Sequence, residues 1–329
     1  HAIQDSVRGS AKQLQSNTAN EQSTNSATAG VLSFDLNGYT LGTESSATGS
    51  TNGSQSYVAW GWKAGGGKPS GGGFFKDDVE YASAAAAGLG GGSMTLTGAS
   101  VGTKQGFSIV TYQGTNSNES IPHGLGSVPA FYICKATGDS GYTDSWNVYH
   151  QSLGNAAYLK LQTSDAPTTG STIWNSTSPT DSLFYVASNS NANENGVDYV
   201  SYIWSDVPGL QKFGKYVGNG ASGWPNADGP FIELGFRPAL VIWKNTDRSE
   251  NWHLLDIKRD PVNFANRKLL PNSGGQETQN NNHEVDFLSN GFKLRNNNGE
   301  LNENNDAYVY MAWAEAPTVN LYGGGSNAR

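Results

Sequence analysis

The feature that most limits how this chain can fold is a nearly apolar six-residue segment that occurs three times. It reads YVAWGW at 57–62, YVSYIW at 199–204 and YVYMAW at 308–313. Side chains alternate between the two faces of a β-strand. In every copy the second, fourth and sixth residues are large and apolar, and the remaining three are uncharged. The pattern predicts an inner strand whose apolar face lies in the core, with the closing tryptophans, Trp62, Trp204 and Trp313, as packing residues.

Other markers repeat in the same order around the last two copies. PAFYICK, which begins at Pro129, matches PALVIWK, which begins at Pro238, and each starts three residues after a Leu-Gly pair. IVTYQG and FGKYVG precede these strings, and WNVYH and WHLLD follow them. Pro238 follows Pro129 by 109 positions, the same separation as between the last two six-residue copies. The shared order predicts two β-modules, residues 105–209 and 210–317.

The first copy has only the second half of this pattern around it. DSVRG aligns with DIKRD and VLSFDLNGYTLG with VDFLSNGFKLR. The strands IVTYQG and FGKYVG, here called the Tyr-Gly markers, have no counterpart in residues 1–63. The same is true of the strands that begin at Pro129 and Pro238, the Leu-Gly…Pro markers. These residues are therefore predicted to form a half module whose apolar face needs a cover. Chain preceding His1, the segment 64–104 or a second subunit could supply it. A first residue other than Met favours the first of these.

The segment 64–104 lies between the half module and the first complete module. Its strings AGGGKPSGGG and AAAAGLGGG are typical of a linker. Between them, FFKDDVEYASAAAA leaves one or two helical turns open as an alternative. Residues 318–329 are predicted to be a C-terminal tail.

Turn-forming residues are frequent along the whole chain. Its 329 residues include 42 glycines, and only 15% are charged. Gly and Asn accept the positive φ angles of tight turns, so this composition favours short strands joined by many turns. The predicted fold class is all-β, with tandem antiparallel β-sandwich, jelly-roll-like modules, the first of them only a C-terminal half copy.

Charge and cysteine content exclude several classes of partner and site. A net charge of −8 argues against nucleic-acid binding, which requires a basic surface to neutralise phosphates. No apolar run approaches the roughly 18 residues of a membrane span, so no membrane insertion is expected. Cys134 is the single cysteine, which rules out an intrachain disulfide and a thiolate metal cluster.

No catalytic or metal-binding pattern emerges from the motifs. HGLGSVP predicts a turn rather than a phosphate-binding loop, because a strand and not a helix follows it. The carboxylate pairs Asp77/Glu80 and Glu284/Asp286 lie in no recognisable cleft motif. The five histidines have no metal-ligand spacing and are expected in surface or turn positions. We therefore predict no enzyme, no catalytic residues, no cofactor and no metal.

Two Asn-rich segments precede the last two copies of the six-residue strand. They read NSNANENGVD at 189–198 and NNNGELNENND at 296–306. Oxygen-rich loops can hold calcium, but these lack the acidic density and fixed spacing of a dedicated site. Polar connections between strands are the favoured interpretation, and calcium remains an open alternative.

One polar loop offers a candidate binding site. Trp224 lies in GASGWPNADGP, residues 220–230, beside Asn226 and Asp228. An exposed tryptophan flanked by amide and carboxylate groups can stack on a sugar ring and bind its hydroxyls. The alternative is a half-buried Trp224 that only anchors the loop.

Several longer strings resemble a known family. GFSIVTYQGTNSNESIPHGLGSVPAFYICKA, WNVYHQSLGNAAYLKLQTSD, FGKYVGNG…DGPFIELGFRPALVIWKN and NLYGGGSNAR look like a repeat domain of uncharacterised virion structural and tail-fibre proteins of marine, cyanophage-like tailed phages. The resemblance covers nearly the whole chain. It implies a structural or host-recognition role in the virion, without catalytic residues. The insertion around Trp224 departs from the shorter loop of the family, which puts a shared ligand role there in doubt.

Three functions follow from these observations. The first is a non-enzymatic virion structural protein, a tail fibre or appendage, that contacts a host surface glycan. The second is a purely architectural capsid or tail decoration or connector that binds other virion proteins, and the third is a polysaccharide-degrading tailspike. Repeated scaffolds with divergent loops suit multivalent display better than a single active site. We expect a homo-oligomer, such as a trimer, at the particle surface.

Overall fold

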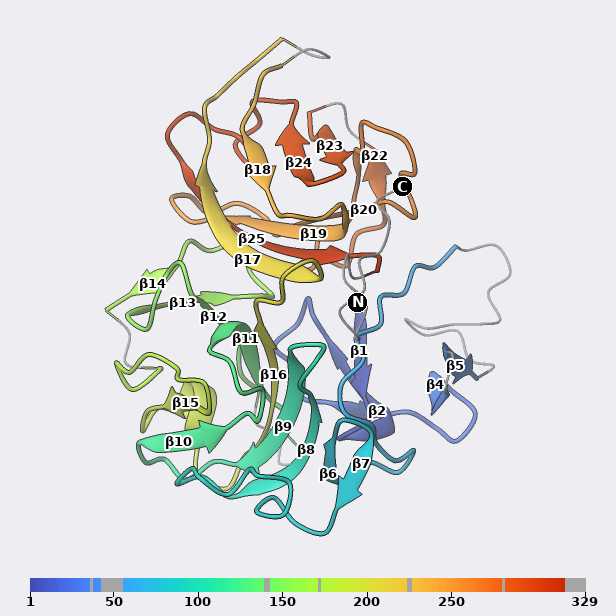
Figure 1. Ribbon diagram of the computed structural model, residues 1–329, viewed down its shortest axis with the longest axis vertical. Coiled ribbons are helices and arrows are strands. Elements are labelled where there is room, and N and C mark those ends of the chain that lie inside the picture. Colours follow the sequence, from blue (N-terminus) through green and yellow to red (C-terminus); the bar gives the residue numbers. More distant parts are fainter. Residues whose placement is uncertain are drawn as a thin grey trace. The chain divides into compact units, whose positions relative to one another are not determined.

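The computed structural model describes residues 1–35, 38–42, 56–138, 143–170, 173–223, 227–279 and 282–316. Over these residues the chain is an all-β, sandwich-type protein made of several mainly antiparallel sheets (Figure 1). The helix α1 (Ser190–Asn193) has a single turn, and no described helix has the length and hydropathy needed to cross a membrane. The chain forms two compact units. Unit 1 comprises residues 1–147 and 171–204, and unit 2 comprises residues 148–170 and 205 onward.

The strands of the main sheet that belong to unit 1 follow the order β11-β16-β9-β8-β6-β7. Their bounds are β6 (Gly73–Lys76), β7 (Val79–Tyr81), β8 (Leu96–Gly102), β9 (Phe107–Gln113), β11 (Pro129–Ala136) and β16 (Asp198–Ser205). β16 and β9 are antiparallel, with Tyr199 opposite Tyr112, whereas β6 and β8 are parallel. A second pair, β10 (Glu119–Pro122) and β15 (Leu183–Val186), completes the module-like part of unit 1.

The segment 64–104 is not the linker that its composition suggests, because it contributes β6, β7 and β8 to this sheet. Its small residues serve close packing. Gly98 of β8 lies so near Val7 that a Cβ there would come within 2.9 Å of the valine side chain. The alternative of helical turns is wrong as well, since the Ala-rich stretch forms turns.

Residues 1–42 form short strands of their own. β1 (Ala2–Asp5), β2 (Gly9–Gln15) and β3 (Ser23–Thr24) make a three-stranded sheet, and β4 (Val31–Asp35) and β5 (Gly38–Leu41) make a hairpin. The six-residue segment 57–62 lies outside the strands, contrary to expectation. In the two later copies this strand pairs with a neighbour on each side, and the described part of residues 1–62 supplies no equivalent pair. Trp62 is therefore only partly buried, with its ring edge-on to Trp204 at 6.0 Å.

The first residues of the chain pack on the main sheet of unit 1. Trp146 donates its indole N–H to the carbonyl of Gln15 at 3.0 Å, and Lys135 donates to the carbonyl of Ala19 at 3.2 Å. Lys135 is fully buried, and burial lowers its pKa to about 8. The half module thus provides hydrogen-bond acceptors for buried groups of the sheet beside it.

The main sheet of unit 2 has the order β17-β25-β19-β20. Its strands are β17 (Gln211–Val217), β19 (Pro238–Asn245), β20 (His253–Asp256) and β25 (Ala307–Ala314). A smaller sheet has the order β18-β24-β23, made of β18 (Phe231–Glu233), β24 (Gly291–Leu294) and β23 (Val285–Leu288). Two strand pairs complete the unit, β13 (Ala157–Lys160) with β14 (Thr168–Thr169) and β21 (Arg267–Lys268) with β22 (Thr278–Gln279). β12 (Asn147–His150) lies at the boundary of the units.

Strands that share sequence occupy equivalent places in the two main sheets. The order β11-β16-β9 of unit 1 corresponds to β19-β25-β17 of unit 2. The Tyr-Gly markers have the same packing role in both. The rings of Tyr112 and Tyr199 stack at 5.3 Å, and those of Tyr216 and Tyr308 stack at 4.9 Å.

The glycine of each marker is required for the same reason. A Cβ on Gly114 would lie 2.1 Å from the carbonyl oxygen of Glu194, and a Cβ on Gly218 would lie 2.1 Å from that of Glu303. Such distances exclude any side chain, so both glycines permit a close approach of two backbones.

The contact between a preceding segment and a main sheet also recurs in unit 2. Trp252 donates its indole N–H to the carbonyl of Lys160 at 3.0 Å, as Trp146 does to Gln15 in unit 1. Gln151 donates to the carbonyl of Phe213 at 2.6 Å. Residues 148–170 therefore pack in unit 2 as the first residues of the chain pack in unit 1, so the compact units do not coincide with the module boundaries expected from sequence.

Both faces of the repeated strand are buried, which corrects the prediction of a single core face. The main core of unit 2 contains the face of β25 that was expected to lie outside it, Tyr308, Tyr310 and Ala312, packed with Trp243 and Phe292. The predicted core residues of the opposite face, Val309, Met311 and Trp313, are buried too. The second face of the strand is uncharged, so other elements can pack on it at little cost. The alternation of residue types along the strand does not show whether they do.

Candidate functional site

The predicted binding loop connects β17 to β18 in unit 2. Trp224 and Asn226 lie outside the described residues, so only Asp228 of the three predicted contacts has a described position. Its side chain is 88% exposed, and Oδ1 lies 2.5 Å from Nζ of Lys293 on β24. The hydrogen bond from Lys293 lowers the pKa of Asp228 below its ordinary value. Asn219 donates its side-chain N–H to the Asp228 carbonyl at 2.9 Å and fixes the backbone at this point.

An exposed aromatic side chain adjoins this ion pair. Phe231 begins β18, is 43% exposed and lies directly opposite Lys293 in the antiparallel pairing with β24. Directly opposed residues place their side chains on the same face of a sheet. Asn219, Asp228, Phe231 and Lys293 therefore form one exposed group, which we call the loop-end surface. Sequence reasoning identified Asp228 but missed Phe231 and Lys293, because their proximity depends on the pairing of β18 with β24.

The loop-end surface has the chemistry of a weak polar binding site. An aromatic face can stack on the apolar face of a ring, while a carboxylate, an ammonium and an amide can bind hydroxyl groups. Lys293 is half-buried and the other groups are exposed, so any ligand would keep much of its hydration. The geometry suits an extended polar ligand better than a small molecule enclosed in a pocket.

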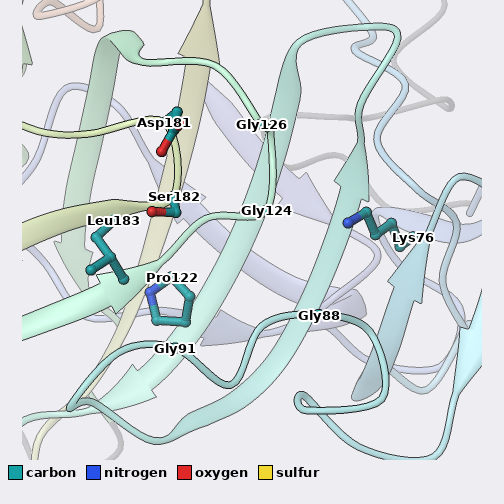
Figure 2. A pocket seen from close by; sticks show the side chains of 9 residues that line it. All are labelled: Lys76, Gly88, Gly91, Pro122, Gly124, Gly126, Asp181, Ser182 and Leu183. Atoms are coloured by element: carbon teal, nitrogen blue, oxygen red, sulfur yellow. The ribbon is translucent and has the colours of Figure 1, made fainter.

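A shallow, glycine-lined depression of about 230 Å³ lies in unit 1 (Figure 2). Figure 2 shows Lys76 and the segment of Asp181, Ser182 and Leu183 on opposite sides of the loop that carries Gly124 and Gly126. These glycines have φ angles of +73° and +72°, as tight turns require. The loop is the HGLGSVP motif, and its structure is the predicted turn followed by β11, with no helix N-terminus to bind a phosphate.

The described histidines beyond position 1 are buried, contrary to the expected surface positions. His123, His150, His253 and His283 are each no more than 1% exposed. Burial lowers the pKa of His123, His150 and His253 to about 4, so these three rings are neutral near pH 7.

Two of these histidines meet a carboxylate in unit 2. Nε2 of His283 lies 2.5 Å from Oε2 of Glu300, and Nε2 of His253 lies 2.7 Å from the same oxygen. The two imidazole rings stack at 4.8 Å. Burial raises the pKa of the Glu300 carboxyl, but the contacts with both imidazoles outweigh it and hold that pKa well below its ordinary value. We call these three residues the His–His–Glu cluster.

Sequence spacing gave no indication of this cluster. His253 begins β20, His283 precedes β23, and Glu300 lies in the Asn-rich loop between β24 and β25. Only the folding of unit 2 brings the three together. A comparison of the two modules gives one indication of the cluster. The residue after Trp146 is Asn147, whereas the residue after Trp252 is His253, so a titratable side chain replaces a neutral one at this position.

The fold defines an all-β protein whose two main sheets repeat one strand order. Its candidate surface combines residues of the loop between β17 and β18 with residues of β18 and β24. The chain belongs to the family described as a domain of unknown function, DUF7483, whose model matches residues 1–74 and 78–317. No curated protein and no solved structure matches the chain.

Proposed function

We propose that the protein is a non-enzymatic structural protein of a virus particle, a tail fibre or appendage, whose exposed loops contact a glycan on the host surface. The loop-end surface is the observation that supports this proposal. It joins an exposed aromatic ring to a carboxylate, an ammonium and an amide on one face of a rigid sheet. Weak sites of this kind become effective when several copies of a protein present them together.

The repeated architecture supports a role in display rather than catalysis. Equivalent positions in the two main sheets are occupied by packing residues, such as the stacked tyrosines and the glycines that permit close backbone approach. A purely architectural decoration or connector would share this scaffold and would use an exposed Phe231 in a contact with another protein instead.

The test is binding of the purified chain to an array of host-surface glycans, together with release of reducing sugar from the same polysaccharides. We expect binding without sugar release. Replacement of Phe231 by Ala should weaken binding roughly tenfold, equivalent to about 1.4 kcal/mol, because the stacking ring is lost. Trp224→Ala should do the same if the predicted loop contact is made.

Tyr39→Ala is the matched control, since Tyr39 is an equally exposed aromatic residue on β5 of unit 1. It should bind as the unmodified chain does. Absence of glycan binding, with antibody labelling of particles at the tail or capsid, would support the architectural alternative. Release of reducing sugar would contradict the proposal and favour a tailspike.

A further inference from the structure

We propose that the His–His–Glu cluster of unit 2 binds a divalent transition metal ion of the zinc class. This site goes beyond the proposed glycan contact, which lies at the loop-end surface and uses none of the same residues. The ligand atoms would be Nε2 of His253, Nε2 of His283 and Oε2 of Glu300. Two imidazoles and one carboxylate are a donor set that Zn²⁺ accepts in proteins, with a further position left for water.

The three donor atoms converge on one small region. One ligand atom from each residue lies within 4.8 Å of the others, and both histidines are almost fully buried. Zinc bonds of about 2.0–2.1 Å in a tetrahedral site separate neighbouring ligand atoms by roughly 3.4 Å. The observed contacts of 2.5 and 2.7 Å to Glu300 would therefore widen by less than about 1 Å to admit an ion.

Hydrogen bonding alone leaves buried nitrogen atoms of the cluster unexplained. Neither ring nitrogen of His253 has an aligned hydrogen-bond partner among the described residues, despite the 2.7 Å approach of Nε2 to Glu300. Nδ1 of His283 likewise has no hydrogen-bond partner among the described residues. Buried polar groups in native proteins are almost always paired. A zinc ion bound through Nε2 would give that atom of His253 a partner once its contact with Glu300 widens, whereas the Nδ1 atoms are not ligands.

The first module shows that the fold itself does not need these residues. Tyr199 donates its hydroxyl to the carbonyl of Ser190 at 2.9 Å, and Tyr308 donates its hydroxyl to the carbonyl of Gly299 at 2.8 Å. Ser190 and Gly299 therefore occupy equivalent positions in the two modules. The next residues in the chain, Asn191 and Glu300, are equivalent as well. The equivalent of His253 is Asn147.

In unit 1 the side chain of Asn147 is bonded to the backbone of Asn191. The side-chain N–H of Asn147 donates to the carbonyl of Asn191 at 2.7 Å. The first module thus has two neutral amide side chains at these positions, whereas the other module has an imidazole and a carboxylate there and adds His283. The change introduces metal ligands where the scaffold tolerates neutral groups.

Two neighbours complete the surroundings of Glu300. The side chain of Asn251 donates to Oε1 at 3.1 Å and orients the carboxylate, as hydrogen-bond donors beside metal ligands do. The ammonium of Lys268 lies 3.2 Å from Oε2 and 3.3 Å from Nε2 of His283. A lysine at this distance competes with a metal ion for the same carboxylate oxygen. An ion pair with Lys268 and a bound metal ion therefore make opposite predictions for zinc affinity when Lys268 is replaced.

The decisive experiment measures zinc in the purified full chain after equilibration with Zn²⁺ and removal of unbound ion. We expect about one zinc ion per chain by elemental analysis, a higher unfolding temperature than in EDTA, and visible absorption bands when Co²⁺ replaces zinc. The double variant His253→Asn/Glu300→Asn copies the residues of the first module, so it should fold normally, as circular dichroism can verify. It should bind no zinc and show no effect of EDTA on its unfolding temperature.

Two further variants separate the metal site from the ion pair. Lys268→Met removes the competing cation and should bind zinc more tightly, whereas Asn251→Ala should weaken binding about 10–100-fold. His1→Ala is the control, because the terminal amine and imidazole of His1 can chelate metal unaided, and it should bind as the unmodified chain does. The proposal is overturned if the unmodified chain binds no zinc, if the double variant binds it equally well, or if Lys268→Met leaves affinity unchanged or weaker.

Discussion

The imidazole of His123 holds the HGLG turn of unit 1 through both of its nitrogen atoms. Nδ1 accepts the backbone N–H of Leu125 at 3.3 Å, so Nε2 carries the proton and donates to the carbonyl of Thr180 at 3.2 Å. Burial lowers the pKa of His123 to about 4, although Thr180 and Asp181 act in the opposite direction. Protonation of Nδ1 would remove the acceptor of the Leu125 N–H, so the neutral ring is part of the turn.

We predict that His123 makes unit 1 less stable in mild acid. The unfolded chain binds the proton near pH 6.5 and the folded chain only near pH 4, so this contribution is complete above pH 6.5 and declines as the pH falls toward 4. Between pH 7 and pH 5 the loss should be about 2 kcal/mol.

Urea unfolding of the unmodified chain and of His123→Gln at both pH values measures this contribution. The difference between the two chains isolates His123 from the other buried histidines, which titrate in both. Equal loss of stability in the two chains on acidification would show that His123 does not titrate as its burial implies.

At the scale of elements, the tight turn between β1 and β2 contains a buried ion pair that recurs after β20. Asp5 accepts the side-chain Nε–H of Arg8 at 2.6 Å, and Asp256 accepts that of Arg259 at the same distance. The Asp5 carboxylate also accepts the hydroxyl of Tyr202 on β16 at 2.6 Å. The turn therefore joins the first strands of the chain to the centre of the main sheet in unit 1.

Arg8→Ala should destabilise unit 1 by about 3–5 kcal/mol, because it leaves the Asp5 carboxylate buried without its charged partner. Lys63→Ala is the control in the same unit, since its ion pair with Asp78 is exposed on both sides and should be worth only about 0–1 kcal/mol. Chemical denaturation of both variants gives the comparison. A loss below 1 kcal/mol for Arg8→Ala would mean that water reaches and solvates Asp5 in the folded state.

At the scale of the whole molecule, each main sheet is completed by a segment that precedes its own module in the sequence. Residues 1–24 supply acceptors to Trp146 and Lys135 in unit 1, and residues 148–170 supply them to Trp252 in unit 2. A complete unit therefore includes residues from outside its own sequence module. Interactions between adjacent repeats contribute a large part of the stability in such architectures.

Deletion of residues 1–25 should therefore act on one unit only. We expect hydrogen exchange to become faster in β11 and β16, where Lys135 and Tyr202 lose their partners, and to stay unchanged in β17, β19 and β25. Mass spectrometry of peptides from both sheets measures this in a single experiment. Equal loss of protection in the two sheets would show that the chain unfolds as one cooperative unit and would contradict the division into two.

The sequence by itself determined the features that depend on local pattern and on internal repetition. Alternating apolar residues predicted the inner strands β16 and β25, and the matching order of the Tyr-Gly and Leu-Gly…Pro markers predicted that two sheets share one strand order. Both signals are local because side-chain alternation and tight turns depend on a few consecutive residues. The glycine of each Tyr-Gly marker is equally readable, since a repeated glycine marks a place where no side chain fits.

Only the tertiary structure decided which strands find partners and which side chains meet. The same six-residue pattern is a central strand in two copies and lies outside the strands at 57–62, because a strand requires neighbours that its own sequence does not encode. The Gly-rich segment expected to be a linker contributes β6, β7 and β8, which pair with one another and with β9. His253, His283 and Glu300 come from three separate segments, and Phe231 meets Lys293 only through the pairing of β18 with β24. Contacts between distant residues depend on the closure of the whole chain, which no local pattern records.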